Sequence, residues 1–281
     1  TFLGEKIQTL EFLYTIIEEN GRIVKAYDSG AKKMAYTVIN GKISGIKQTW
    51  HESGPIESQT HYLNGVREGL KEVWNEDGQL YSRVNYSNNV KVGLEEIWYE
   101  NGQLYSRVNY SNGNKIGLEE FWYDNGQIKS RVNYQGNRLL LTGNTKTGIE
   151  ETFHKNGKTA SRVKYLNGLK HGIERIWDKY GKLSNKVHYV NGVKDGLEET
   201  FHENGRIKSR VNFINGIKQG FEETFYESGE IGSRVKFIDG VKQGPSEYWY
   251  KNGNKKWYIN FINGKKEGLV ESWYENGNKE T

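Results

Sequence analysis

The segment Gly93–Asn112, GLEEIWYENGQLYSRVNYSN, decides the fold that we predict for the whole chain. Its side chains alternate in character with period two on both sides of Glu100–Gly102, which is typical of a β-hairpin. A three-residue turn that ends with Gly102 in the left-handed conformation pairs Trp98 with Leu104, whereas a two-residue turn scatters the apolar residues over both faces. We therefore predict a three-residue turn with a positive φ at Gly102.

The same pattern recurs every 24 residues along the 281-residue chain, with a single longer step of 31 residues. A column of glycines marks the first position of each unit: Gly21, Gly45, Gly69, Gly93, Gly117, Gly148, Gly172, Gly196, Gly220, Gly244 and Gly268. Tandem units of this kind stack on their neighbours. The predicted fold is all-β, an elongated single-layer antiparallel β-meander of about eleven hairpins and about 22 strands.

Two regions depart from the repeat. Residues 1–39 are the weakest copy and are predicted to form an N-terminal capping repeat. Residues 40–281 are predicted to be the tandem array, with a seven-residue insertion near 136–142.

The composition fits a thin architecture. Hydrophobic residues make up only 35% of the chain, whereas aromatic residues reach 13%. No apolar run is long enough to cross a membrane as a helix. The net charge is +5 and the pI is about 9.0, which permits an anionic partner without requiring one.

The predicted register assigns side chains to faces. Glu95 lies opposite Arg107, and equivalent pairs recur in later units. Trp98 and Tyr110 then share one face with the Glu96 carboxylate, for which we expect hydrogen bonds to neighbouring Ser and Tyr side chains.

A single-layer sheet leaves its aromatic face without a covering layer, so we expect an aromatic groove on this face. The groove and an accessory contact from the insertion give the candidate partner-binding residues Trp98, Trp122, Tyr110, Tyr134, Leu139, Leu140 and Leu141.

The two long edges of the predicted sheet differ in charge. The hairpin tips are mostly acidic, as at Glu52, Glu76, Glu100 and Asp124. The opposite edge carries a row of cations that could contact an anionic polymer or membrane surface: Lys91, Lys115, Lys146, Lys170, Lys194 and Lys218.

Catalytic, cofactor and metal sites are not expected. The chain has no Cys, which excludes thiolate chemistry. His51, His154 and His202 occupy a column that Tyr holds in other units, and neighbours in this column are too far apart to share a metal ion. Gly143–Gly148 lacks the Gly-Lys-Ser/Thr ending and the following helix that a phosphate loop needs. We therefore expect a protein that is not an enzyme.

The repeated words NG-x-x-x-G-L-x-E-x-W-Y-x-NG-Q-L-x-S, seen at 64–82 and 112–130, resemble the variant MORN repeat of bacteria. The resemblance covers roughly residues 20–281. It implies a β-hairpin array that serves in scaffolding, surface attachment or partner binding, without shared catalytic residues. Eukaryotic relatives are linked to membranes and anionic lipids. The choline-binding repeats of cell walls are similar in style, but their tandem aromatic boxes are missing here.

The sequence thus predicts a non-enzymatic repeat scaffold that presents the aromatic groove to a protein or glycan partner, in a role such as surface attachment or adhesion. The alternative is an envelope-associated module that binds anionic polymer or lipid head groups through its Lys/Arg edge. Nucleic acid is disfavoured because a row of Glu shares the groove. A cell-envelope or extracellular location is favoured over a cytoplasmic one. Salt distinguishes the two functions, because edge binding is strongly salt-sensitive and groove binding is not.

Overall fold

The structure is a computed structural model that describes residues 20–134 and 146–280. The chain divides into two units, Thr1–Thr145 and Lys146–Thr281, and each is treated by itself. The described residues hold 22 strands and no helix, which confirms the predicted all-β class. The predicted insertion at 136–142, with Leu139, Leu140 and Leu141, lies outside the described residues.

The first unit contains ten strands: β1 (Asn20–Ala26), β2 (Lys32–Ile39), β3 (Lys42–Trp50), β4 (Ile56–Leu63), β5 (Val66–Trp74), β6 (Leu80–Ser87), β7 (Val90–Trp98), β8 (Leu104–Ser111), β9 (Asn114–Trp122) and β10 (Ile128–Tyr134). The second unit contains twelve: β11 (Lys146–Phe153), β12 (Thr159–Leu166), β13 (Leu169–Lys170), β14 (Gly172–Trp177), β15 (Leu183–Val190), β16 (Val193–Phe201), β17 (Ile207–Ile214), β18 (Ile217–Phe225), β19 (Ile231–Ile238), β20 (Val241–Trp249), β21 (Lys255–Ile262) and β22 (Lys265–Ser272).

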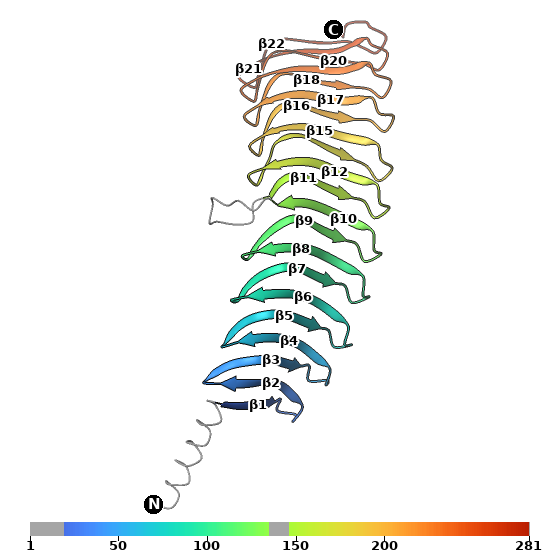
Figure 1. The fold of residues 1–281 in the computed structure, drawn as a ribbon. Coiled ribbons are helices and arrows are strands. Elements are labelled where there is room, and N and C mark those ends of the chain that lie inside the picture. The colour runs from blue at the N-terminus through green and yellow to red at the C-terminus, as the bar shows by residue number, and fades with distance from the viewer. Residues whose placement is uncertain (1–19, 135–145, 281) are drawn as a thin grey trace, which may run out of the picture. The chain divides into compact units, whose positions relative to one another are not determined.

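Each unit is an antiparallel meander in which a strand pairs with the strands before and after it in the chain, as Figure 1 shows. The short strands β13 and β14 both pair with β12 and together take the place of one strand. Every side chain in such a sheet therefore has neighbours from its own repeat and from the next one.

The hairpin tips have the predicted three-residue turn. The backbone N–H of Tyr99 donates to the Gln103 carbonyl at 2.8 Å, and the N–H of Gly102 donates to the Tyr99 carbonyl at 2.9 Å. Gly102 has a φ of 79°, which confirms the left-handed conformation that a side chain would disfavour.

The turns at the opposite edge are shorter than those at the tips. Asn191 and Gly192 both have positive φ, at 49° and 83°, and form a two-residue turn between the paired residues Val190 and Val193. Residues 193–196 belong to strand β16.

The predicted register is correct at the tip and wrong beyond it. Trp98 pairs with Leu104 as expected, but the register then shifts and Ile97 pairs with Ser106. Tyr105 is the extra residue of a β-bulge, so Arg107 lies opposite Glu96 rather than Glu95. The same one-residue correction applies to the pairs predicted in later repeats, such as Glu199 opposite Arg210.

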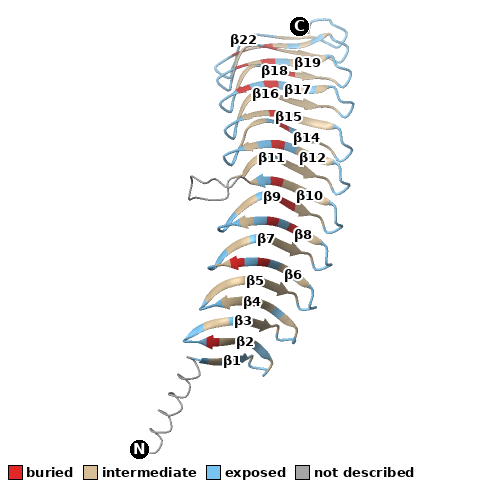
Figure 2. Cartoon of the chain, in the orientation of Figure 1, coloured by how far each residue is buried: buried red, intermediate tan, exposed pale blue. Residues whose placement is uncertain are grey.

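The bulge places Trp98 and Tyr110 on opposite faces. We call the two sides the valine face, with the column Val84, Val108, Val132, Val163, Val187, Val211 and Val235, and the tryptophan face, with the column Trp74, Trp98, Trp122, Phe153, Trp177, Phe201, Phe225 and Trp249. The valine face is the core, since all seven of these valines are buried. Figure 2 shows the buried residues as short stretches within strands such as β6 and β8.

Candidate functional site

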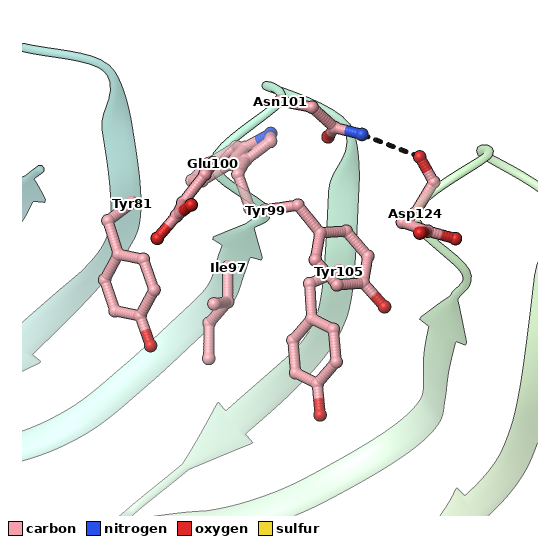
Figure 3. A pocket seen from close by; sticks show the side chains of 8 residues that line it. Tyr81, Ile97, Tyr99, Glu100, Asn101, Tyr105 and Asp124 are labelled. Atoms are coloured by element: carbon pink, nitrogen blue, oxygen red, sulfur yellow. Dashed lines mark hydrogen bonds between the residues drawn. The ribbon is translucent and has the colours of Figure 1, made fainter. Parts of the chain in front are cut away.

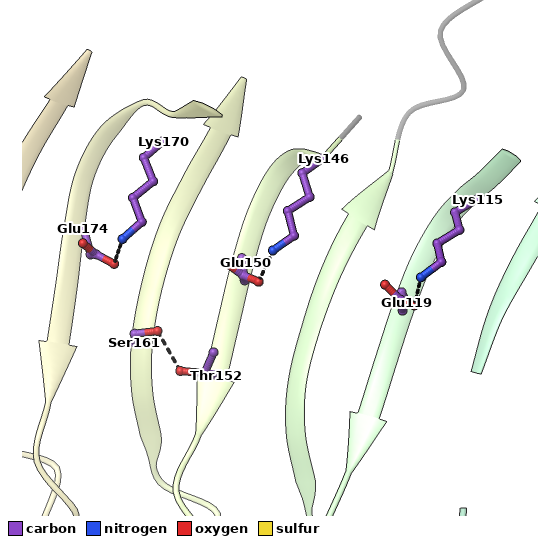
Figure 4. A network of polar contacts seen from close by, with 8 residues as sticks. All are labelled: Lys115, Glu119, Lys146, Glu150, Thr152, Ser161, Lys170 and Glu174. Carbon is purple, nitrogen blue, oxygen red and sulfur yellow. Dashed lines mark hydrogen bonds and ion pairs between the residues drawn. The ribbon is translucent and has the colours of Figure 1, made fainter. Parts of the chain in front are cut away.

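Lysine, glutamate and an aromatic ring form a repeated cluster on the valine face. The Nζ atom of Lys91 lies 2.5 Å from Glu95 and 5.0 Å from the centre of the Tyr110 ring. Figure 4 shows the equivalent pairs Lys146–Glu150 and Lys170–Glu174, at 2.5 and 2.6 Å. The cluster stabilises the sheet because it offsets each charge with a carboxylate and a ring face.

These lysines are the cations that the sequence assigned to an anionic partner. In each of the six, the ammonium group forms a salt bridge with the glutamate four residues later: Lys91, Lys115, Lys146, Lys170, Lys194 and Lys218. Binding an anion here would have to compete with that internal carboxylate, which lowers the attraction.

The cluster also predicts how stability depends on pH. Burial raises the pKa of Tyr165 to about 12 from 10.0, and Glu150, which accepts a hydrogen bond from it, adds to the rise. The folded chain thus holds this proton more tightly than the unfolded chain. The stability that it contributes is complete below pH 10 and is lost as the pH rises toward 12.

We expect the Tyr165→Phe variant to lose less stability than the wild type between neutral pH and about pH 11, because phenylalanine has no such proton to release. Phe213 and Phe237 stand in the same column, so the ring fits. Urea unfolding at both pH values measures the difference. An equal loss in both proteins would contradict the assignment.

The tryptophan face is covered in a different way. Arg107 lies between strands, with one nitrogen 2.7 Å from Glu120 and its guanidinium 5.4 Å from the centre of the Trp122 ring. Arg83 makes the same contacts with Glu96 and Trp98. The Glu96 column therefore pairs with arginine or lysine, and the expectation of hydrogen bonds to Ser and Tyr is wrong.

This arrangement divides the predicted aromatic groove. Trp98 and Trp122 are half-buried under arginines on the tryptophan face, whereas Tyr110 and Tyr134 lie under lysines on the valine face. The four rings do not form one continuous surface. A binding role for any of them stays a prediction.

The column of Tyr and His joins successive hairpins. The Tyr99 hydroxyl donates to the backbone carbonyl of Trp122 at 2.8 Å, and Nε2 of His154 lies 2.9 Å from the carbonyl of Trp177. His and Tyr are interchangeable here because each can present a donor to that carbonyl. Within the described part of the chain, no group of three or more His, Asp or Glu residues could hold a metal ion, and no helix could span a membrane.

A cleft of about 490 Å³ interrupts the repetition on strands β6 to β8. Figure 3 shows Tyr81 and Tyr105 on either side of Ile97, which lies on β7 between the strands that carry the two tyrosines, β6 and β8. The Tyr105 ring stands edge-on to Tyr99, with centroids 5.1 Å apart and planes at 80°. We call this the tyrosine cleft; it is lined by Tyr81, Ile97, Trp98, Tyr99, Glu100, Asn101, Tyr105 and Asp124.

The hairpin bulge creates this cleft. Strict period-two alternation would place Tyr105 on the face opposite Val108. As the extra residue of the bulge, Tyr105 instead contacts Phe121, whose strand partner is the buried Ser106. The sequence does hold a signal that could have found the site. In the column of Tyr81 and Tyr105 the other units carry Lys33, Glu57, Lys129, Ala160, Ser184, Lys208, Gly232, Lys256 and Glu280.

A second cleft, of about 510 Å³, lies in the other unit and is more polar. Its charged groups are engaged with one another or with the backbone. Arg162 lies 3.4 Å from Glu151, and the Lys158 ammonium donates to the Tyr180 carbonyl at 2.7 Å. We therefore regard the tyrosine cleft as the stronger candidate.

The fold and its columns define a β-hairpin repeat protein. Six segments match the family model described as MORN repeat variant, so these six are MORN variant repeats. The matched residues are 67–88, 91–112, 115–135, 146–167, 194–215 and 266–281. Such repeats are typically non-enzymatic, and the chain is a repeat scaffold or interaction module.

Other comparisons add little. A porin-like protein from Bacteroides uniformis ATCC 8492 is 10% identical, with a TM-score of 0.20, over 89% of this chain and 93% of that chain. The Photorhabdus luminescens Tc holotoxin pore is 12% identical, with a TM-score of 0.14, over 92% of this chain and 18% of that chain. Neither similarity supports a functional argument. No curated protein matches the chain.

Proposed function

We propose that the protein is a docking scaffold that binds a protein partner in the tyrosine cleft. The observation that carries the proposal is the pair Tyr81 and Tyr105. Residues that build the array recur in nearly every unit, as the valine column does, but these two tyrosines occur in adjacent units only. A side chain that the repeat does not need is best explained by a ligand.

The exposure of the cleft supports this function. Tyr81 is 50% exposed although it is a large aromatic residue, and no second layer of the unit covers it. Tyrosine is enriched at protein interfaces because its ring supplies contact area at a low cost in conformational entropy. Glu100 and Asn101 at the rim add polar groups that can orient a ligand.

The ring geometry favours a protein over a glycan. Sugar rings stack on flat aromatic platforms, whereas Tyr99 and Tyr105 stand at 80° and form the walls of a cup. A cup suits an inserted side chain. The alternative, an anionic polymer on the lysine edge, receives less support because six of those lysines are already paired with glutamates.

An array of random short peptides, probed with the purified chain, tests the proposal. The variant Tyr81→Ser with Tyr105→Ala introduces residues that the column already contains at Ser184 and Ala160. We expect the wild type to bind a subset of peptides and the variant to lose about tenfold or more in affinity, because two aromatic contacts are removed.

The matched control is Tyr180→Ser, which removes a tyrosine that is 67% exposed in the second unit and should leave binding unchanged. Circular dichroism at the binding temperature verifies that each variant is folded, and the single Tyr81→Ser variant avoids any packing defect at Tyr105. Unchanged binding by the double variant would overturn the proposal. Tyrosine-dependent binding to a neutral glycan array, without binding to peptides, would replace the protein partner with a glycan.

A further inference from the structure

The tip loops of the first unit are uniformly acidic, whereas those of the second unit are mixed in charge. Each loop of the first unit begins with an exposed carboxylate: Asp28, Glu52, Glu76, Glu100 and Asp124. None of these four-residue loops, 28–31, 52–55, 76–79, 100–103 and 124–127, contains a basic residue. In the second unit the same position holds Lys155, Lys179 and Lys251 as well as glutamates. The hairpin turn therefore does not require the acid.

This acidic row meets the tyrosine cleft. Glu100 and Asp124 are tip residues and also line the cleft beside Tyr99 and Tyr105. The face of an aromatic ring carries partial negative charge, so a cup of rings with carboxylates at its rim attracts a cation. The attraction grows when the cation is withdrawn from water.

The spacing of the tips adds a second constraint. Successive tips are two strands apart, which is about 10 Å. A polyproline II helix rises about 3.1 Å per residue and returns to the same side every third residue, after about 9 Å. The side chains of a β-strand alternate sides, so two residues three positions apart would point in opposite directions and one of them would point away from the sheet.

We infer that the partner segment is an extended, polyproline-like stretch with Lys or Arg at every third position, and that one of these cations sits in the tyrosine cleft. Its other basic side chains meet the neighbouring tips, such as Glu76. This inference rests on the proposed docking function and names its ligand class.

Fluorescence anisotropy with a labelled peptide of repeated Arg-Pro-Pro triplets tests the inference, with Gln-Pro-Pro triplets as the neutral match. We expect the wild type to bind the arginine peptide about tenfold more tightly than the glutamine peptide. Tyr105→Ala should weaken arginine-peptide binding about tenfold, and Glu100→Gln should weaken it about threefold. Glu227→Gln, at an equivalent tip in the second unit, is the control and should change nothing.

The outcomes separate this inference from the function on which it rests. Equal, tyrosine-dependent binding of both peptides would overturn the cationic ligand and leave the docking function intact. Arginine-peptide binding that responds to Glu100→Gln but not to Tyr105→Ala would show that no cation binds in the tyrosine cleft, because diffuse attraction to the acidic tips would explain such a result. Binding of neither peptide, while the random array still shows tyrosine-dependent binders, would overturn the inference alone.

Discussion

Replacing Gly196 with valine is expected to destabilise strands β15 and β16 by about 3 kcal/mol, the sum of backbone strain and a steric clash. Gly196 has a φ of 110°, a conformation that a β-branched residue strongly disfavours. A Cβ at this position would lie 3.1 Å from Cβ and Nδ1 of His188 on the neighbouring strand. The His188 ring is itself held by a contact with the Asp195 carbonyl, so it cannot easily move aside.

The matched control is Gly205→Val, at a hairpin tip of the same unit. Gly205 also has a positive φ, of 83°, but a Cβ there would meet nothing within 4 Å. This variant isolates the backbone strain and should cost about 1–2 kcal/mol. Hydrogen exchange of the amides in β15 to β17 measures both local opening free energies. Equal destabilisation by the two variants would show that the close approach to His188 adds nothing to the cost of Gly196→Val.

The second large effect is expected from Val108→Asp, which should destabilise the first unit by about 4 kcal/mol because it buries a carboxylate without a partner. Val108 is only 4% exposed and pairs with Glu95, so the new carboxylate would face an existing one. Protonation of the aspartate relieves part of the cost. The loss should therefore be larger at neutral pH than at about pH 4.

Asn109→Asp is the control, because Asn109 is the next residue along β8, is exposed, and lies on the opposite face. It should change the unfolding free energy by less than about 0.5 kcal/mol. Urea unfolding followed by circular dichroism gives both values. A comparable loss at Asn109 would mean that the faces of β8 are assigned the wrong way round.

The glycine columns made most of the fold predictable. Gly102 indicated the tip turn because only a left-handed residue closes a three-residue hairpin loop, and the 24-residue period then gave the number of strands. The bulge at Tyr105 left no such signal, since it does not require a positive φ and no glycine marks it.

That single missed residue determined what could be inferred about the site. Beyond a bulge every side chain moves to the other face, so Tyr110 and Val108 were grouped with Trp98 instead of with Glu95 and Ile97. The ring of Tyr105 was assigned to the wrong side for the same reason. Its departure from the column was visible in the sequence, but its contact with Tyr99 depends on the bulge.

The links between hairpin tips have a mechanical consequence. The side-chain amide of Asn204 donates to the Glu227 carbonyl, and that of Asn252 donates to the Glu275 carbonyl, so each of these tips is bonded to the next one along the chain. A pulling force on the two ends of such a meander breaks the backbone hydrogen bonds between one pair of adjacent strands before it reaches the next pair. Each released 24-residue hairpin adds about 80 Å of slack at roughly 3.4 Å per residue. Within a unit, the array can therefore lengthen in discrete steps, one hairpin at a time, while the hairpins beyond the point of release remain folded.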